Sequence, residues 1–368
     1  MDEEVFSSMS ILLLLGIFAV AAGLVWISGT KLSGVADKLA EKTGLGRAFI
    51  GVLLLGGITS LPEAVTTIAT SLKGNAGMAV SNILGGVSMQ VTILAVVDFF
   101  KRKYPLSSRS TSLNVLLQGI ALILMLALTV IFIPVPDLSI GHFGLQSVVL
   151  LLLFTGSLYL THKYTGIVWL SYQTDNTKTL KERISFLQDK LRQVEEKDTQ
   201  GTEAEMTTAG FMKQHWWTFL WSSGLILIGG YFVIVSAEAI AEQSGISKNF
   251  AGLVLVAITT SLPEVSTVVG AVKLKRYEMA FSNIFGTNLF DVALIFLADL
   301  FFLEGPVFNA LDQFSIVAAA LGIVLTVIFL LGLTMKSERK LLGVGYDSLT
   351  VIALYLAGLV VLFRLDQS

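Results

Sequence analysis

The feature that most constrains this chain is a series of ten apolar stretches, each about 20 residues long, separated by short charged or turn-rich breaks. A run of this length crosses the hydrocarbon core of a bilayer as a helix, because backbone polar groups there must be satisfied within the segment. Only 14% of the 368 residues are charged and 54% are hydrophobic, whereas soluble domains carry about 25% charged residues. We therefore predict an all-α integral membrane protein with transmembrane helices near residues 9–30, 47–72, 77–100, 112–133, 144–163, 216–240, 249–272, 279–302, 311–334 and 347–364.

Composition narrows the possible partners and cofactors. The chain has no cysteine, which excludes disulfides and thiolate metal sites, and its net charge of −2 gives no basic surface for nucleic acid. The first apolar segment has no basic leader before it, so we expect a retained helix rather than a cleaved signal. The expected surroundings are a lipid bilayer, with no organic cofactor, no nucleic acid and no obligatory protein partner.

Basic residues indicate the orientation in the membrane. The connections after segments one, three, five, seven and nine hold 22 of the 25 lysines and arginines. Cytoplasmic loops of membrane proteins carry such an excess. The alternation predicts a multi-pass protein of the cell membrane with both termini outside and a cytoplasmic connection between segments five and six.

The chain contains an internal duplication. A shift of 201 residues superposes residues 36–98 on residues 237–299 without a gap, with 21 of 63 positions identical. Five helices per copy is an odd number, so the second copy enters the membrane from the opposite side. We predict two inverted five-helix repeats, 1–171 and 215–368, joined by a linker over 172–214. This arrangement is expected of an alternating-access transporter with its site between the repeats.

Carboxylates lie inside these apolar segments. The sequence Thr-Ser-Leu-Pro-Glu occurs at 59–63 and at 260–264, and a third acid, Asp291, follows in the second copy. An ionised carboxylate at a helix centre costs about 2.5–3.5 kcal/mol, so the glutamates Glu63 and Glu264 need a cation, and no lysine or arginine lies at these helix centres. Each proline lacks an N–H, which frees a carbonyl on the preceding turn that can also coordinate an ion.

Helical spacing gathers further oxygen donors near these acids. Thr59, Ser60 and Glu63 stand at i, i+1 and i+4, and Thr260, Ser261 and Glu264 repeat the pattern. On the next predicted helix of each copy a polar stripe recurs every fourth residue: Asn82, Gly86 and Gln90, then Asn283, Thr287 and Asp291. Carboxylate, amide, hydroxyl and carbonyl oxygens suit a hard cation, with calcium the default over magnesium, which demands stricter octahedral geometry.

These motifs resemble the two alpha repeats of the calcium/cation antiporter superfamily, most closely its prokaryotic sodium/calcium exchangers. The resemblance covers all ten segments and implies exchange of Ca²⁺ against Na⁺ or protons by alternating access. It implies Glu63 and Glu264 at the centre, Gln90 and Asp291 beside them, Thr59 and Thr260 facing calcium, and Ser60 and Ser261 lining flanking sodium sites. Ca²⁺ and Na⁺ are then the transported ions and partners.

The first copy departs from the family pattern. The second copy keeps Gly286-Thr287-Asn288-Leu289-Phe290-Asp291, whereas the first reads Gly85-Gly86-Val87-Ser88-Met89-Gln90. Gly86 lacks a hydroxyl that the family directs toward sodium, and Gln90 is longer than the usual Asn, although its amide oxygen is still a neutral donor. Three alternatives stay open: fewer coupled sodium ions, coupling to protons, or a different divalent ion such as Mg²⁺.

Four other acids occupy matching places in the two copies. Asp98 and Asp299 stand late in their segments, and we expect solvated caps or interfacial anchors there rather than ligands. Asp37 and Glu238 lie near the first helix of each repeat, where a role in ion entry is a weaker hypothesis than an exposed helix end.

The linker predicts one soluble element. Thr179 and Glu182 form a capping box, and apolar residues follow at helical spacing to Val194, which predicts an amphipathic cytoplasmic helix that docks on the membrane or the bundle. No EF-hand loop is present in the sequence.

Rival functions of other classes are a passive cation channel, an ion sensor that evolved from a transporter, and an intramembrane hydrolase. The duplication with two proline-broken segments favours alternating access over a channel. The absence of a His-Glu-x-x-His motif argues against a metallohydrolase, so we do not expect an enzyme.

Overall fold

The computed structural model describes residues 6, 9–43, 47–99, 105–108, 112–163, 201–243, 261–336, 340–341 and 344–366. Within these ranges the chain is helical apart from turns, one π-helical and one 3-10 segment, and two short hairpins. The predicted amphipathic helix near 179–194 lies outside the described residues, as does Thr260.

The helices agree closely with the apolar segments. Their bounds are α2 Ile11–Thr43, α3 Arg47–Ile50, the π-helix η1 Gly51–Gly56, α4 Gly57–Thr59, α5 Leu61–Leu72, α6 Ala76–Phe99, α7 Leu113–Phe132, α8 Leu145–Lys163, α10 Gly201–Gln243, α13 Leu262–Lys273, α14 Tyr277–Phe301, the 3-10 helix η3 Val307–Ala310, α15 Gln313–Met335 and α16 Tyr346–Asp366. The main differences are at α2, which continues to Thr43 where the prediction ended at residue 30, and at α10, which begins inside the predicted linker.

Membrane-length helices dominate the described part of the chain. Eight helices there are long and apolar enough to cross a bilayer, and the bent pair of η1 and α4 with α5 raises the number to as many as nine. Because the start of the predicted segment 249–272 lies outside the described residues, only its second half is seen, as α13.

Secondary structure recurs at the spacing of the sequence duplication. Helices α5 and α13, α6 and α14, and α8 and α16 begin at equivalent positions of the two copies. Two antiparallel hairpins, β1 Ser139–Ile140 with β2 Phe143–Gly144 and β3 Lys340–Leu341 with β4 Val344–Gly345, keep the same offset. The duplication therefore extends in structure well beyond the stretch that aligns in sequence.

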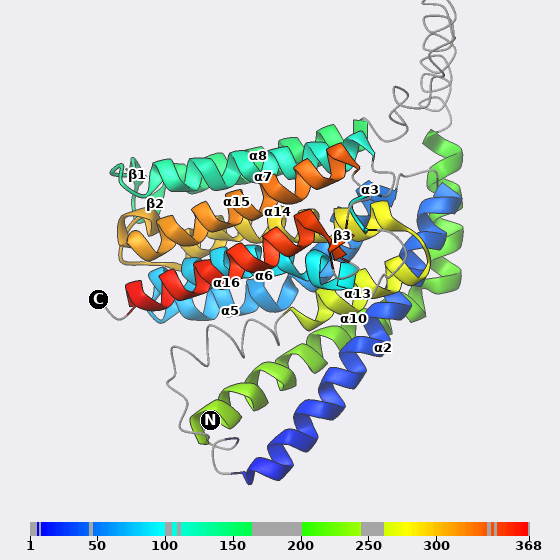
Figure 1. Cartoon of the computed structure of the whole chain (residues 1–368), viewed down its shortest axis with the longest axis horizontal. Coiled ribbons are helices and arrows are strands. Elements are labelled where there is room, and N and C mark those ends of the chain that lie inside the picture. The colour runs from blue at the N-terminus through cyan, green and yellow to red at the C-terminus, as the bar shows by residue number, and fades with distance from the viewer. Residues whose placement is uncertain are drawn as a thin grey trace, which may run out of the picture.

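Two groups of helices can be seen in Figure 1. Helices α6–α8 and α14–α16 run roughly alongside one another, whereas α2 and α10 pair with each other and cross that group obliquely. Helix α13 lies between the two groups, packed on both α2 and α14.

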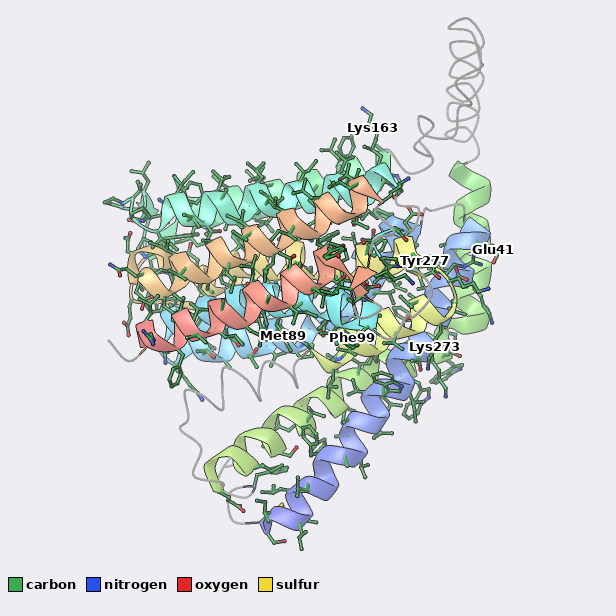
Figure 2. The ribbon with its side chains drawn as sticks, in the orientation of Figure 1. Glu41, Met89, Phe99, Lys163, Lys273 and Tyr277 are labelled. Atoms are coloured by element: carbon green, nitrogen blue, oxygen red, sulfur yellow. The ribbon has the colours of Figure 1, made fainter. Side chains whose placement is uncertain are left out.

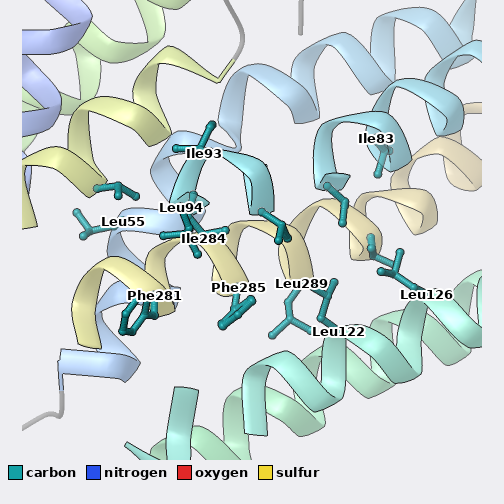
Figure 3. Close-up of a cluster of buried hydrophobic side chains, with 14 of the residues drawn as sticks. Leu55, Ile83, Ile93, Leu94, Leu122, Leu126, Phe281, Ile284, Phe285 and Leu289 are labelled. Carbon is teal, nitrogen blue, oxygen red and sulfur yellow. The ribbon is translucent and has the colours of Figure 1, made fainter. Parts of the chain in front are cut away.

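The apolar core is centred on α14. Phe281, Phe285 and Leu289 are fully buried, and they lie toward Leu122 on α7 (Figure 3). On the lipid side the apolar residues are exposed instead, for example Leu12, Leu152 and Trp221. An apolar exterior around an apolar core is what a bilayer permits, since lipid does not penalise exposed leucine.

The sequence predicted solvated caps or interfacial anchors at Asp98 and Asp299. Solvated caps are wrong, because both side chains are fully buried. Asp299 accepts hydrogen bonds from the backbone N–H of Val307 at 2.7 Å and of Gly144 at 2.9 Å, and from the Ser147 hydroxyl at 2.6 Å.

Asp98 repeats this arrangement with the halves exchanged. It accepts hydrogen bonds from the backbone N–H of Leu106 at 2.5 Å and of Gly345 at 3.0 Å. Each aspartate therefore accepts hydrogen bonds from the turn that follows it in its own half and from a hairpin of the other half. These bonds connect the two halves at both ends of the bundle.

Candidate functional site

The first motif lies at a break between two helices. Ser60 has φ −84° and ψ 0°, and the helix axis bends by 48° there, between α4 and α5. Ser261 has nearly the same backbone angles, φ −82° and ψ 1°, at the start of α13. The prolines explain the shared geometry, because Pro62 and Pro263 cannot donate the intrahelical hydrogen bond that would continue the preceding turn.

Glycines let the first broken helix approach α14 closely. A methyl group built on Gly286 would lie 2.5 Å from Cα of Val52, and one built on Gly56 would lie 2.9 Å from the backbone nitrogen of Thr287. Only a residue without a side chain fits at these contacts. The approach brings the hydroxyl oxygens of Thr59 and Thr287 to 3.3 Å from each other.

One contact joins equivalent residues of the two halves. The Gln90 amide nitrogen donates to Oδ2 of Asp291 at 2.9 Å, and these residues occupy the same position in the two copies. The Asn288 amide and the Val87 carbonyl, which are separated by the same offset, lie 3.5 Å from each other. The point at which the halves meet is therefore lined by the stripe that the sequence indicated.

The three acids gather around this point. The Glu63 carboxylate interacts electrostatically with those of Glu264 and Asp291. Thr59 lies beside Glu264, and Ser60 lies beside Asp291. Glu264 is fully buried and Asp291 almost so, while Glu63 is half-buried. Like charges this close repel each other unless a cation or a proton neutralises them.

Several buried oxygens at the site have no hydrogen-bond partner. They are both carboxylate oxygens of Glu264, Oε2 of Glu63, Oδ1 of Asp291, Oε1 of Gln90 and Oδ1 of Asn283. Buried polar atoms are normally paired, because an unpaired one costs about 1–3 kcal/mol. Oxygen acceptors without donors are the chemistry that a desolvated hard cation requires.

The structure describes eight of the nine predicted site residues and brings seven of them into contact with one another, while Ser261 stands directly before α13, which carries Glu264. Glu63, Glu264, Asp291, Gln90, Thr59, Ser60, Ser261 and Thr287 are described, and all but half-buried Glu63 are buried. Within the described ranges no three acidic or histidine side chains converge closely enough to hold a metal ion in this conformation.

Sequence reasoning missed Thr267 as part of the site. Its hydroxyl donates to the carbonyls of Pro263 and Glu264, each at 3.0 Å, and accepts from the Asn283 amide at 2.6 Å. The identity of Thr66 and Thr267 in the duplication was the available signal, because Thr66 bonds to Pro62 and Glu63 in the same way.

The two halves of the site differ in exposure. Asn283 is fully buried, whereas its equivalent Asn82 is exposed. Among the described residues, a side chain built on Gly85 or Gly86 would meet no atom within 4 Å, while one built on Gly286 would clash with Val52. In this part of the chain the half contributed by α5 and α6 is therefore open, and the half contributed by α13 and α14 is closed.

A bundle of membrane-length helices with buried acids and unpaired oxygens where its two halves meet defines a membrane protein of the ion-transporting class. The sequence profile of the family described as "Sodium/calcium exchanger protein" matches residues 13–163 and again residues 214–364. The chain belongs to this family, whose activity is membrane ion antiport. The two matches are related by the same offset as the internal duplication.

Named relatives and solved structures agree with this assignment. The chain is 28% identical to the inner membrane protein YrbG of Escherichia coli over 77% of its own length and 78% of that protein. It is 24% identical to the sodium/calcium exchanger MaX1 of Methanosarcina acetivorans, over 89% of this chain and 92% of that one. A crystal form of the sodium-calcium exchanger NCX_Mj soaked with Na⁺ and no Ca²⁺ has the same fold, with a TM-score of 0.65 at 18% identity, covering 95% of this chain and 99% of that chain.

Proposed function

We propose that this protein exchanges Ca²⁺ for Na⁺ across the membrane by alternating access between two inverted five-helix repeats, ten transmembrane helices in all. The observation that carries the proposal is the hydrogen bond between Gln90 and Asp291, because a local two-fold axis through the site would bring equivalent residues of the two copies into contact in this way. With five helices in each half, that axis lies in the membrane plane. The repeats are 1–171 and 215–368, and the linker is 172–214.

The proposed calcium ligands are the oxygens without donors. Glu63 and Glu264 supply the charge that balances a divalent ion, and Thr59 and Thr260 supply neutral oxygens. Asp291 already accepts the Gln90 amide through Oδ2, which leaves its Oδ1 and the Gln90 carbonyl oxygen to face the ion. Ser60 and Ser261, at the two helix breaks, and Thr287 line the flanking positions that sodium would take.

Coupling follows from competition for these oxygens. Since neighbouring carboxylates repel each other when no cation is bound, an empty site is unfavourable, and only an occupied site lets the bundle change its exposed side. The half-open site of this structure is one of the two end states. The pattern of basic connections predicts that both termini lie outside and the linker in the cytoplasm, so the open half, next to the loop after α5, faces outward.

Uptake of calcium-45 into proteoliposomes tests the proposal. We expect uptake to be driven by an outward sodium gradient, and we expect Glu63→Gln or Glu264→Gln to reduce it at least tenfold, since either change removes one of the two glutamate charges proposed to balance the ion; a tenfold loss corresponds to about 1.4 kcal/mol. Glu304→Gln is the matched control, because Glu304 is exposed and outside the site. Full uptake by both site variants would refute the ligand assignment.

The first repeat supports a second candidate, exchange of Ca²⁺ or another divalent ion such as Mg²⁺ for protons. Gly86 offers no hydroxyl to sodium, and the neighbouring acids can bind protons. Uptake driven by an outward proton gradient and indifferent to sodium would select this candidate. Downhill flux that no counter-ion alters would indicate a channel, and ion binding without flux would indicate a sensor.

A further inference from the structure

An ion pair joins α2 to the turn before α14. Arg276 Nε lies 2.7 Å from Oδ1 of Asp37, with Asp37 buried in α2 and Arg276 half-exposed directly before α14. Figure 2 places Glu41 of α2 at the same end of the molecule as Lys273 and Tyr277, which flank this turn. The pair therefore connects the oblique α2 and α10 group to the part of the bundle that holds Glu264.

The same interface is closely packed. A side chain built on Gly29 would overlap the Ser266 hydroxyl, and one built on Gly270 would lie 3.1 Å from Cα of Thr30. The Ser33 hydroxyl donates to the Thr267 carbonyl at 2.7 Å. These contacts hold α2 against α13 on the closed side of the site.

The equivalent interface in the other half is loose. Among the described residues, a side chain built on Gly230, the counterpart of Gly29, would meet only Pro62, at 3.6 Å. The sequence has Ile234 at the position of Ser33, and isoleucine has no hydroxyl to donate. In the part of the chain that the structure describes, α10 therefore contacts α5 far less than α2 contacts α13.

The turn that carries Arg276 has a counterpart with the same backbone, in which the arginine is replaced by Asn75. Arg276 N bonds to the Ala271 carbonyl at 2.9 Å, and Asn75 N bonds to the Thr70 carbonyl at 3.1 Å. Lys275 and Gly74 precede them, both with positive φ. Asp37 corresponds to Glu238, so the second pair of positions keeps the acid and lacks the arginine.

We propose that Asp37 and Arg276 are positioning residues that set the balance between the two end states, favouring closure over α13 and hence opening over α5. The inference rests on the alternating access proposed above. Closure over α13 forms this ion pair, whereas closure over α5 forms no equivalent pair. The resting protein therefore favours the state in which the ion pair is formed. Both residues act through the packing of α2 on α13 and not as ligands of the transported ion.

Site-directed labelling tests this directly, because the natural chain has no cysteine. Asn82→Cys reports the open half and Asn283→Cys reports the closed half. Each is labelled by a membrane-impermeant maleimide, applied separately to right-side-out and inside-out vesicles in sodium without calcium, so that the occupied site can change its exposed side. We expect Asp37→Asn and Arg276→Gln each to lower the ratio of the labelling rate at position 82 to that at position 283 about two- to fivefold, the range of a partly exposed ion pair.

Two further variants separate an ion pair from general damage. The double variant Asp37→Asn/Arg276→Gln should shift the ratio no further than either single change, because the same interaction is already lost. Asn75→Arg adds a cation on the equivalent turn, at the position that corresponds to Arg276, and should lower the ratio when Asp37 and Arg276 are intact. Asp312→Asn, at an exposed helix start far in sequence from this interface, is the matched control and should leave the ratio unchanged.

Unchanged labelling ratios in Asp37→Asn and Arg276→Gln would overturn the proposal, as would additive effects in the double variant. A fall in thermal stability with an unchanged ratio would make the pair a structural contact only and would also overturn it. The labelling measures which half is accessible and does not require calcium flux. A shifted ratio in a protein without sodium-driven calcium uptake would therefore reject the proposed function while leaving the role of the pair intact.

Discussion

Among single residues, one hydroxyl distinguishes the two halves of the site. Thr287 contributes a hydroxyl that contacts Thr59, whereas its equivalent Gly86 contributes none. Among the described residues, a side chain built on Gly86 meets no atom within 4 Å. A serine side chain therefore fits at position 86 and would supply the hydroxyl oxygen that Gly86 lacks.

We expect Gly86→Ser, combined with Gln90→Asn, to strengthen the dependence of calcium uptake on sodium, since the change adds one oxygen donor on the open half of the site. The measurement is the Hill slope and half-saturating sodium concentration for calcium-45 uptake. Gly86→Ala with Gln90→Asn is the control, since it fills the same space without an oxygen. Equal sodium dependence in the two variants would mean that the hydroxyl has no part in coupling.

Among the helices, glycines allow the π-helix η1 and α14 to lie in close contact. Gly85 and Gly286 are equivalent in the duplication, yet among the described residues only Gly286 lies against another backbone, at Val52. Alanine at Gly286 must push the two elements apart and so separate Thr59 from Thr287, whereas alanine at Gly85 meets no described residue.

We therefore predict that Gly286→Ala lowers the free energy of unfolding by about 1–3 kcal/mol, the usual cost of overpacking, and weakens calcium uptake. Gly85→Ala should change stability by less than about 0.5 kcal/mol in either direction, because the added methyl group contacts nothing. Thermal melting in detergent compares the pair. Similar melting temperatures for the two variants would contradict the close approach of η1 and α14.

At the scale of the whole molecule, the buried side chains of Asp98 and Asp299 connect the two halves. Asp98 and Asp299 each bind backbone N–H groups of both halves, so their loss leaves buried donors unpaired. These hydrogen bonds do not involve α2 or α10.

Asparagine at either position should destabilise the protein, because its side-chain NH2 would face a backbone N–H, and both groups are hydrogen-bond donors. We expect Asp98→Asn and Asp299→Asn each to cost about 1–3 kcal/mol of unfolding free energy, measured by chemical or thermal unfolding in detergent. Asp312→Asn is the control: Asp312 is an exposed N-cap whose Oδ1 accepts from Ser315, and asparagine caps equally well. Melting temperatures equal to that of Asp312→Asn would show that the hydrogen bonds of Asp98 and Asp299 contribute nothing.

Hydropathy and motif spacing along the chain were enough to predict the membrane class, the helix positions and most of the candidate site. Apolar runs fix where helices form in lipid, because no other backbone arrangement of a single segment satisfies its polar groups there. Acids at helix centres stand out for the same reason, since lipid makes each of them costly. Glu63, Glu264 and Asp291 could therefore be picked out without any structure.

The partners of the polar groups and the open side of the site emerge only from contacts in three dimensions. Asp98 and Asp299 looked like solvated ends because sequence cannot show that a hairpin of the other half covers them. Two equivalent halves also carry nearly the same local signals, so the packing of α2 on α13 rather than α10 on α5 is invisible in either half alone. That choice depends on contacts between the halves, such as Asp37 with Arg276, whose members are far apart along the chain.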